Sequence, residues 1–84
     1  MKKIDFSKVE YENIDGKKAV VDVRVGIGNQ IYFNAQDIAV RDLGRKIYKS
    51  EGEIELTDEE AQVVINVANS MPIVYREPIV EKLS

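Results

Sequence analysis

Carboxylates are the side chains of this sequence whose number and spacing could do chemistry, and they gather in one acidic segment. The six acids between residues 51 and 60, with no basic residue among them, are Glu51, Glu53, Glu55, Asp58, Glu59 and Glu60. Their oxygens suit Ca²⁺ and Mg²⁺, but the spacing is not that of an EF-hand loop, which needs acids at its positions one, three and five, then a glycine and a distant glutamate. A short strand and a helix cap account for all six acids, so we predict no metal site.

Acid–base catalysis by a pair of these carboxylates would need a cleft that raises the pKa of one of them. A chain of 84 residues has little room for such a cleft. The sequence has no cysteine, which excludes disulfides and thiolate metal sites, and no histidine, the commonest general base at neutral pH. We therefore expect a protein that is not an enzyme and that binds no cofactor.

The run Gly26-Ile27-Gly28 follows a predicted strand, as the start of a dinucleotide-binding fingerprint would. The third glycine of that fingerprint is replaced by Ile31, and the chain is too short for the fold that carries it. The run is better interpreted as a turn between a strand and a helix.

Basic residues recur at helical spacing just before the acidic segment. The basic stripe on this helix consists of Arg41, Arg45, Lys46 and Lys49, with Tyr48 nearby. Three of them, Arg41, Arg45 and Lys49, stand four residues apart. Such a stripe could bind single-stranded RNA, but a net charge of −3, from 12 basic and 15 acidic residues, disfavours nucleic acid. We interpret the stripe as a solvated face that pairs with the acids of residues 51–60. A nucleic-acid-associated regulatory module remains the alternative.

Two neighbouring aromatic residues give the best indication of an interaction surface. Tyr32 and Phe33 are adjacent, so they point in different directions in either a helix or a strand, and at least one should lie outside the core. Exposed aromatic side chains mark contact surfaces. Three residues of the basic stripe join these aromatic residues, so the predicted interaction surface consists of Tyr32, Phe33, Arg41, Arg45 and Lys49.

The strongest local pattern in the sequence predicts a helix over residues 58–69, and the other elements are expected to pack around it. Thr57 can cap it, and Glu60 can reach back to the backbone N–H of Thr57, which completes a capping box. The apolar stripe of this helix falls at helical spacing and consists of Ala61, Val64, Ile65 and Ala68.

The first part of the chain predicts a β-hairpin, with alternating strands over residues 4–12 and 18–25 around a turn at Asp15-Gly16. A short helix over residues 28–35 follows, although a continued strand competes with it because residues 30–33 have high β-propensity.

A second helix should run over residues 40–49, with Asp37 able to cap a start at Ile38. Gly44 lies on its apolar face and indicates close packing against another element. The other residues of that face are Val40, Leu43, Ile47 and Tyr48.

The strict alternation of residues 53–56 predicts a strand that joins the hairpin as a third member. Pro72 should stop the capped helix, and a last helix over residues 77–83 would hold Pro78 in its first turn. The expected fold is a single α+β domain, residues 1–84, with a small antiparallel sheet, three to four short helices and the order β-β-α-α-β-α-α.

The N-terminal residues lack the apolar run of a signal peptide, and no stretch reaches the length of a membrane span. We expect a cytoplasmic protein without membrane contact.

Three runs resemble small, mostly uncharacterised proteins encoded in phage and prophage gene clusters: residues 28–32, 42–48 and 53–60. The resemblance covers residues 25–68 and contains no catalytic motif. It implies a non-enzymatic role, such as assisting virion or tail assembly. With the surface described above, we expect an interaction protein whose partners are other proteins, including further copies of itself.

Overall fold

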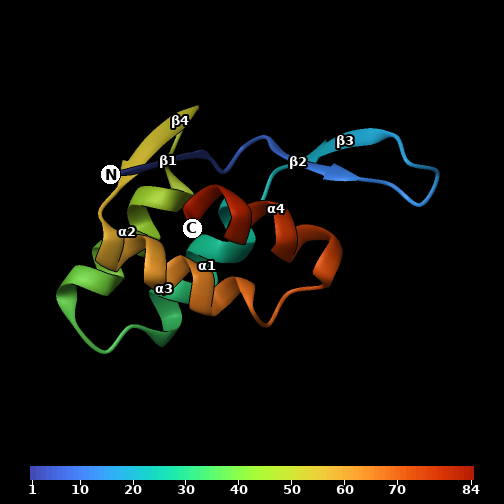
Figure 1. Cartoon of the computed structure of the whole chain (residues 1–84). Coiled ribbons are helices and arrows are strands. Elements are labelled where there is room, and N and C mark those ends of the chain that lie inside the picture. The colour runs from blue at the N-terminus through green and yellow to red at the C-terminus, as the bar shows by residue number, and fades with distance from the viewer.

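Four short strands and four helices follow one another in the order β-β-β-α-α-β-α-α in the computed structural model, which describes all 84 residues (Figure 1). The strands are β1 (Lys2–Asp5), β2 (Val9–Glu12), β3 (Lys18–Val21) and β4 (Glu53–Leu56). The helices are α1 (Arg24–Asn34), α2 (Ile38–Tyr48), α3 (Asp58–Ala68) and α4 (Ile73–Leu83). The predicted α+β class is confirmed.

The strands form two separate antiparallel pairs, where the sequence predicted one three-stranded sheet. β1 pairs with β4, and β2 pairs with β3 in the hairpin. The predicted strand over residues 4–12 is broken because Asp5 Oδ1 accepts hydrogen bonds from the backbone N–H of Ser7 at 2.9 Å and from its hydroxyl at 2.5 Å. This local turn redirects the chain, so that its two halves pair with different partners.

Residues 28–34 are helical, which decides between the two predicted alternatives, while Ala35 is the extended C-cap. The helix α1 begins earlier than expected, at Arg24, so Gly26-Ile27-Gly28 lies inside it and the predicted turn at that run is wrong. A local turn precedes this start: Asp22 Oδ1 accepts a hydrogen bond from the Arg24 backbone N–H at 3.0 Å, while the N-cap residue Val23 makes no side-chain cap. The strand before it therefore ends at Val21 instead of residue 25.

The three elements in the middle of the chain lie close to their predicted ranges: β4 matches residues 53–56, α3 ends one residue early at Ala68, and α2 spans 38–48 instead of 40–49. Asp37 caps α2 by accepting from the Val40 N–H at 2.9 Å. The capping box of α3 is complete: Thr57 Oγ1 accepts from the Glu60 N–H at 3.1 Å, and Glu60 Oε1 accepts from the Thr57 N–H at 2.9 Å.

The last helix is longer than predicted and begins at Ile73, which places Pro78 in its interior and not in its first turn. The carbonyl of Pro72 accepts from the N–H groups of Tyr75 and Arg76, so the first turn forms without Pro78. Proline has no N–H, and the carbonyl of Val74 therefore lacks its helical partner. Val74 is solvent-exposed, so water can bond this carbonyl.

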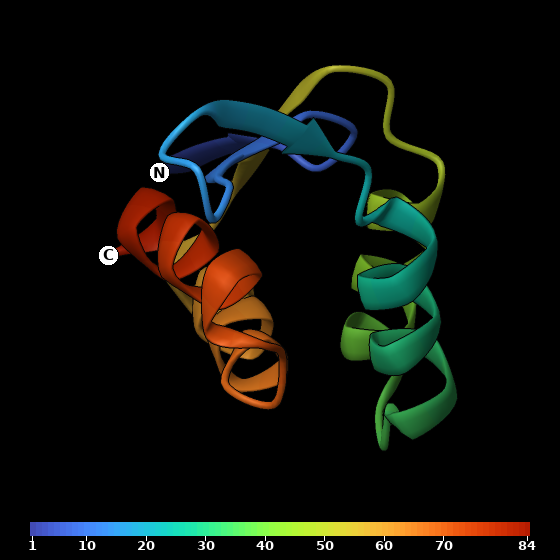
Figure 2. The same cartoon turned by 90° about the vertical axis from the view of Figure 1, so that its right-hand side faces the viewer.

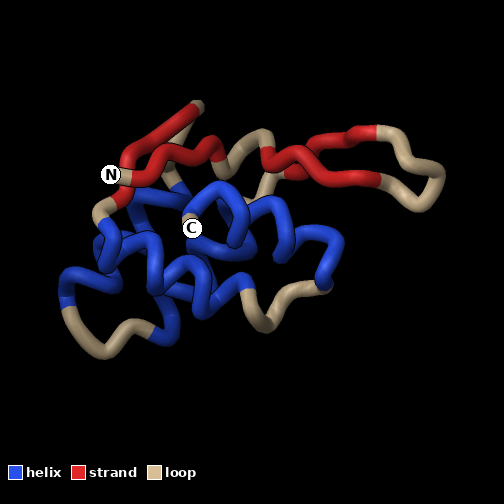
Figure 3. The backbone as a smooth tube through the Cα atoms, in the orientation of Figure 1, coloured by secondary structure: helices blue, strands red, loops and turns tan.

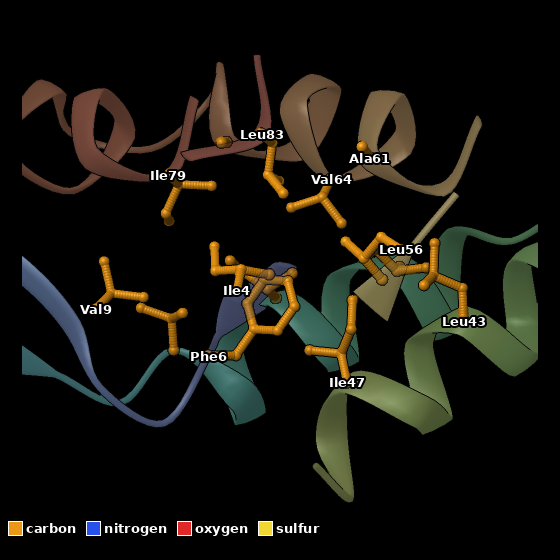
Figure 4. Packing of buried hydrophobic residues seen from close by; sticks show 14 residues of the cluster. Ile4, Phe6, Val9, Leu43, Ile47, Leu56, Ala61, Val64, Ile79 and Leu83 are labelled. Atoms are coloured by element: carbon orange, nitrogen blue, oxygen red, sulfur yellow. The ribbon is translucent and has the colours of Figure 1, made fainter. Parts of the chain in front are cut away.

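The helices form two pairs, α1 with α2 and α3 with α4, that lie on opposite sides below the strands (Figure 2). The β2–β3 hairpin projects beyond the helices (Figure 3). Between the pairs lies one core of 14 buried apolar residues, with Phe6, Ile47, Leu56, Val64 and Ile79 fully enclosed (Figure 4). No helix combines the length and the apolar character that crossing a membrane requires.

Candidate functional site

The α1 and α2 helices approach each other closely at a pair of glycines, Gly28 and Gly44. A Cβ atom built on Gly44 would lie 2.8 Å from the backbone N of Tyr32 and 3.0 Å from the carbonyl O of Gly28. One built on Gly28 would lie 3.1 Å from the carbonyl O of Gly44. The close packing predicted for Gly44 is confirmed, and both positions leave no room for a side chain.

A shallow groove of about 220 Å³ lies over this glycine contact. Its lining residues are Gly28, Asn29, Tyr32, Phe33, Gly44, Arg45, Tyr48 and Lys49. Since the glycines carry no side chains, backbone forms part of the groove and the larger residues form its rims. The groove brings together four of the five predicted surface residues: Tyr32, Phe33, Arg45 and Lys49.

Tyr32 connects the aromatic and the basic parts of the groove. The Tyr32 and Phe33 rings meet edge to face, with centroids 5.1 Å apart and planes at 75°. The guanidinium carbon of Arg45 lies 5.7 Å from the centroid of the Tyr32 ring, within the range of a cation–π interaction. Tyr32 is half-buried by these neighbours, whereas Phe33 is 77% exposed.

Tyr48 is a groove residue, although the spacing of α2 predicts it on the apolar face of that helix. Its side chain is 50% exposed. Tyr48 follows Gly44 by four residues, so it projects from the side of α2 that meets α1, while Leu43 and Ile47 face the core. Its spacing from Gly44 was the signal that could have identified it. Two more exposed apolar residues on the same helices are Val25 and Ile38.

The fifth predicted residue, Arg41, lies outside the groove, one helical turn before Arg45. Both arginines have only the exposed Asp42 as an ionic neighbour, with nitrogen–oxygen distances of 3.5 Å from Arg41 and 4.0 Å from Arg45. Lys49 is absent from every ion pair of the chain. We call Tyr32, Phe33, Arg41, Arg45, Tyr48 and Lys49 the α1/α2 face.

The expected pairing of the basic stripe with the acidic segment is confirmed for Lys46 but is not observed for Arg41, Arg45 and Lys49. Only Lys46, on another side of α2, reaches that segment: its Nζ lies 3.7 Å from Glu60 Oε1 and donates to the Glu55 carbonyl at 2.8 Å. The three cations of the α1/α2 face, Arg41, Arg45 and Lys49, therefore have among them one carboxylate, that of Asp42, as an ionic neighbour in the chain.

The acids of residues 51–60 have separate structural positions. Glu60 belongs to the capping box, and Glu55 Oε1 lies 3.7 Å from Lys3 Nζ across the β1–β4 pair. No three acids of the chain come together in a metal-binding arrangement.

The α1/α2 face thus combines the exposed rings of Phe33 and Tyr48, the cations Arg45 and Lys49, and a groove. The chain matches no protein-family model, no curated protein and no solved structure.

Proposed function

We propose that this chain is a non-enzymatic interaction protein that uses the α1/α2 face to bind another protein. The bound segment of that protein is acidic and also carries apolar side chains. The observation that supports the proposal is the grouping of exposed Phe33 and Tyr48 with Arg45 and Lys49 around one groove. Tyrosine, phenylalanine and arginine are enriched in protein interfaces, where a few such residues supply most of the binding energy.

The size of the groove favours a macromolecular partner over a small substrate. Its volume of about 220 Å³ is below the range of about 300–1,000 Å³ typical of sites that enclose a small molecule. A rim of exposed rings with a shallow floor suits a side chain or a short segment that projects from another protein surface.

The charges specify the chemistry of this partner. Arg45 and Lys49 have no strong ionic partner in the chain, so a carboxylate from outside would pair with them without displacing one. The resemblance to small phage and prophage proteins supports an accessory role in assembly, carried out in the cytoplasm.

One observation favours a nucleic-acid-associated module as a second candidate. Arg41, Arg45 and Lys49 do not pair with the acidic segment, and the neighbouring rings could stack on unpaired bases. The net charge of −3 acts against this candidate because it repels the phosphate backbone.

The experiment titrates the full chain with three fluorescently labelled probes and follows their anisotropy. The probes are a peptide of alternating glutamate and leucine, a matched peptide of lysine and leucine, and a single-stranded oligouridine. We expect the acidic peptide to bind, and we expect Phe33→Ala and Arg45→Ala each to weaken that binding about tenfold.

Ile14→Ala and Lys17→Ala are the matched controls, because they remove an exposed apolar and a basic side chain at the hairpin turn, away from the groove. The proposal is overturned if the acidic peptide does not bind, or if the controls weaken binding as much as the two variants. Oligouridine binding that is lost in Arg45→Ala, with no binding of the acidic peptide, would decide for the nucleic-acid module.

A further inference from the structure

A second and larger groove lies between the β2–β3 hairpin and α4. Its volume is about 760 Å³. Tyr11 of β2 contacts Tyr75 of α4 edge to face, with ring centroids 5.1 Å apart, and this contact fixes the hairpin against the helix. We call this site the hairpin–α4 groove.

Apolar surface is available inside the hairpin–α4 groove. Ile73 and Val74, from the first turn of α4, line it and are 55% and 46% exposed. Pro78 and Tyr11 extend the apolar surface towards the hairpin. Large aliphatic side chains that remain this exposed within a concave surface are typical of a contact site.

Carboxylates surround this apolar surface and outnumber the cations. Four glutamates and two lysines line the groove: Glu10, Glu12, Glu77, Glu81, Lys18 and Lys82. None of the six takes part in an ion pair of the chain. Glu77 and Glu81 stand one turn apart on α4, where like charges destabilise a helix. Cations from a partner would relieve this repulsion.

The two surfaces described so far are complementary. The α1/α2 face presents exposed aromatic rings and an excess of positive charge, whereas the hairpin–α4 groove is mostly polar, contains the exposed side chains of Ile73 and Val74 and has an excess of negative charge. They lie on different sides of the molecule, because α1 and α2 stand opposite α4 and the hairpin above it (Figure 2). One molecule therefore cannot bring its own two surfaces together.

We propose that the partner of the α1/α2 face is the hairpin–α4 groove of a second copy of this chain. The inference rests on the proposed function and names its partner. Phe33, the most exposed ring of the face, enters the groove beside Ile73 and Val74, while Arg45 and Lys49 pair with Glu77 and Glu81. This contact joins two different surfaces, so each pair of copies keeps one free face and one free groove. Such a heterologous contact adds copies in a row or closes a ring.

Charge reversal tests this pairing. Reversing the charges of one surface should abolish the contact, and mixing two variants with opposite reversals should restore it. One variant carries Arg45→Glu and Lys49→Glu, and the other carries Glu77→Lys and Glu81→Lys. Sedimentation velocity at roughly 10 μM to 1 mM should show concentration-dependent assembly of the wild type beyond a dimer. Each variant alone should associate at least about tenfold more weakly, and an equimolar mixture of the two should recover assembly.

The matched control is the chain with Lys2→Glu and Lys3→Glu. Each reversal changes the charge by two units, so the net charge of the control also goes from −3 to −7. Both changes lie on β1, away from the two surfaces. Circular dichroism spectra of each variant should match that of the wild type, which checks that the variant folds. The inference is overturned if the wild type stays monomeric, if the control loses assembly as the first variant does, or if the mixture remains monomeric. A monomeric wild type that still binds the acidic peptide through Phe33 and Arg45 would refute the self-pairing and leave the proposed function standing.

Discussion

Replacing Gly44 with alanine tests whether the α1–α2 contact depends on the absence of a side chain. The new Cβ would lie 2.8 Å from the Tyr32 backbone N and 3.0 Å from the Gly28 carbonyl O, whereas an ordinary contact begins at 3.4 Å. The nearest atoms belong to backbone, so no side chain can rotate away. The helices must separate by several tenths of an ångström, which also disturbs the groove above the contact.

The expected change in stability combines two opposing effects. Alanine is favoured over glycine in a helix interior by about 1 kcal/mol. Overpacking of a close contact costs about 1–3 kcal/mol, and the upper value applies here because the clash is with backbone on the partner helix. Gly44→Ala should therefore destabilise the fold by about 2 kcal/mol, which lowers the melting temperature of a domain of this size by about 8–16 °C.

Gly26→Ala is the control, because Gly26 also lies in α1 but a Cβ atom there would meet nothing within 4 Å. It should gain helix propensity without a clash and raise the melting temperature by a few degrees. Thermal and urea denaturation followed by circular dichroism measure both variants. If Gly44→Ala proves as stable as Gly26→Ala, the inference that α1 and α2 are in tight contact at Gly44 is refuted.

Three further predictions concern the cap, the core and the acid response. Thr57→Ala removes one bond of the capping box and should destabilise the chain by about 1 kcal/mol in urea denaturation, whereas Thr57→Ser should retain most of the stability. Leu56→Ala empties a fully enclosed position of the core and should cost about 2–5 kcal/mol, visible as a loss of the cooperative thermal transition; a change below about 1 kcal/mol would contradict the packing. Hydrogen bonds from the Arg24 side chain lower the pKa of Asp22, and a hydrogen bond from the Ser7 hydroxyl lowers the pKa of Asp5. Each carboxylate therefore contributes to stability at a pH above its pKa in the unfolded chain. This contribution is lost as the pH falls through the lower pKa that the carboxylate has in the folded chain. The free energy of unfolding should therefore decrease below about pH 4, and a slope unchanged by Asp22→Asn would refute this origin.

Local signals account for the parts of the fold that were predicted correctly. Asp37 and Thr57 are caps whose partners lie three residues away, so the sequence contains both members of each bond. The strand over residues 53–56 alternates strictly and is bounded by Gly52, whose φ is +97°. In each case the deciding interaction spans only a few residues.

The errors arose where distant parts of the chain or solvent decide the outcome. The Asp5–Ser7 turn divides the alternating run of residues 4–12, but the partners of its two halves lie in different parts of the chain: β1 pairs with the distant β4, and β2 with β3. Pro78 is accepted inside α4 because the neighbouring turn faces water, which spacing alone does not show.

The composition of the α1/α2 face was predictable from the sequence, but its geometry was not. Tyr32 and Phe33 were identified by their adjacency, and the basic stripe by its period. The grouping of Tyr48 with them depends on Gly28 and Gly44, which bring two helices within contact of each other.

The pairing of β1 with β4 sets the order in which the chain can fold as it is made. Ile4 of β1 lies opposite Ile54 of β4, fifty residues later in synthesis. At about 5–20 residues per second, the first strand emerges from a ribosome roughly 3–10 s before its partner exists. The hairpin and the first helix pair, whose members are neighbours in sequence, can form during that interval. During that interval Ile4 has no strand opposite it, so the part of the core that β1 and β4 share can form only after residues 53–56 are made.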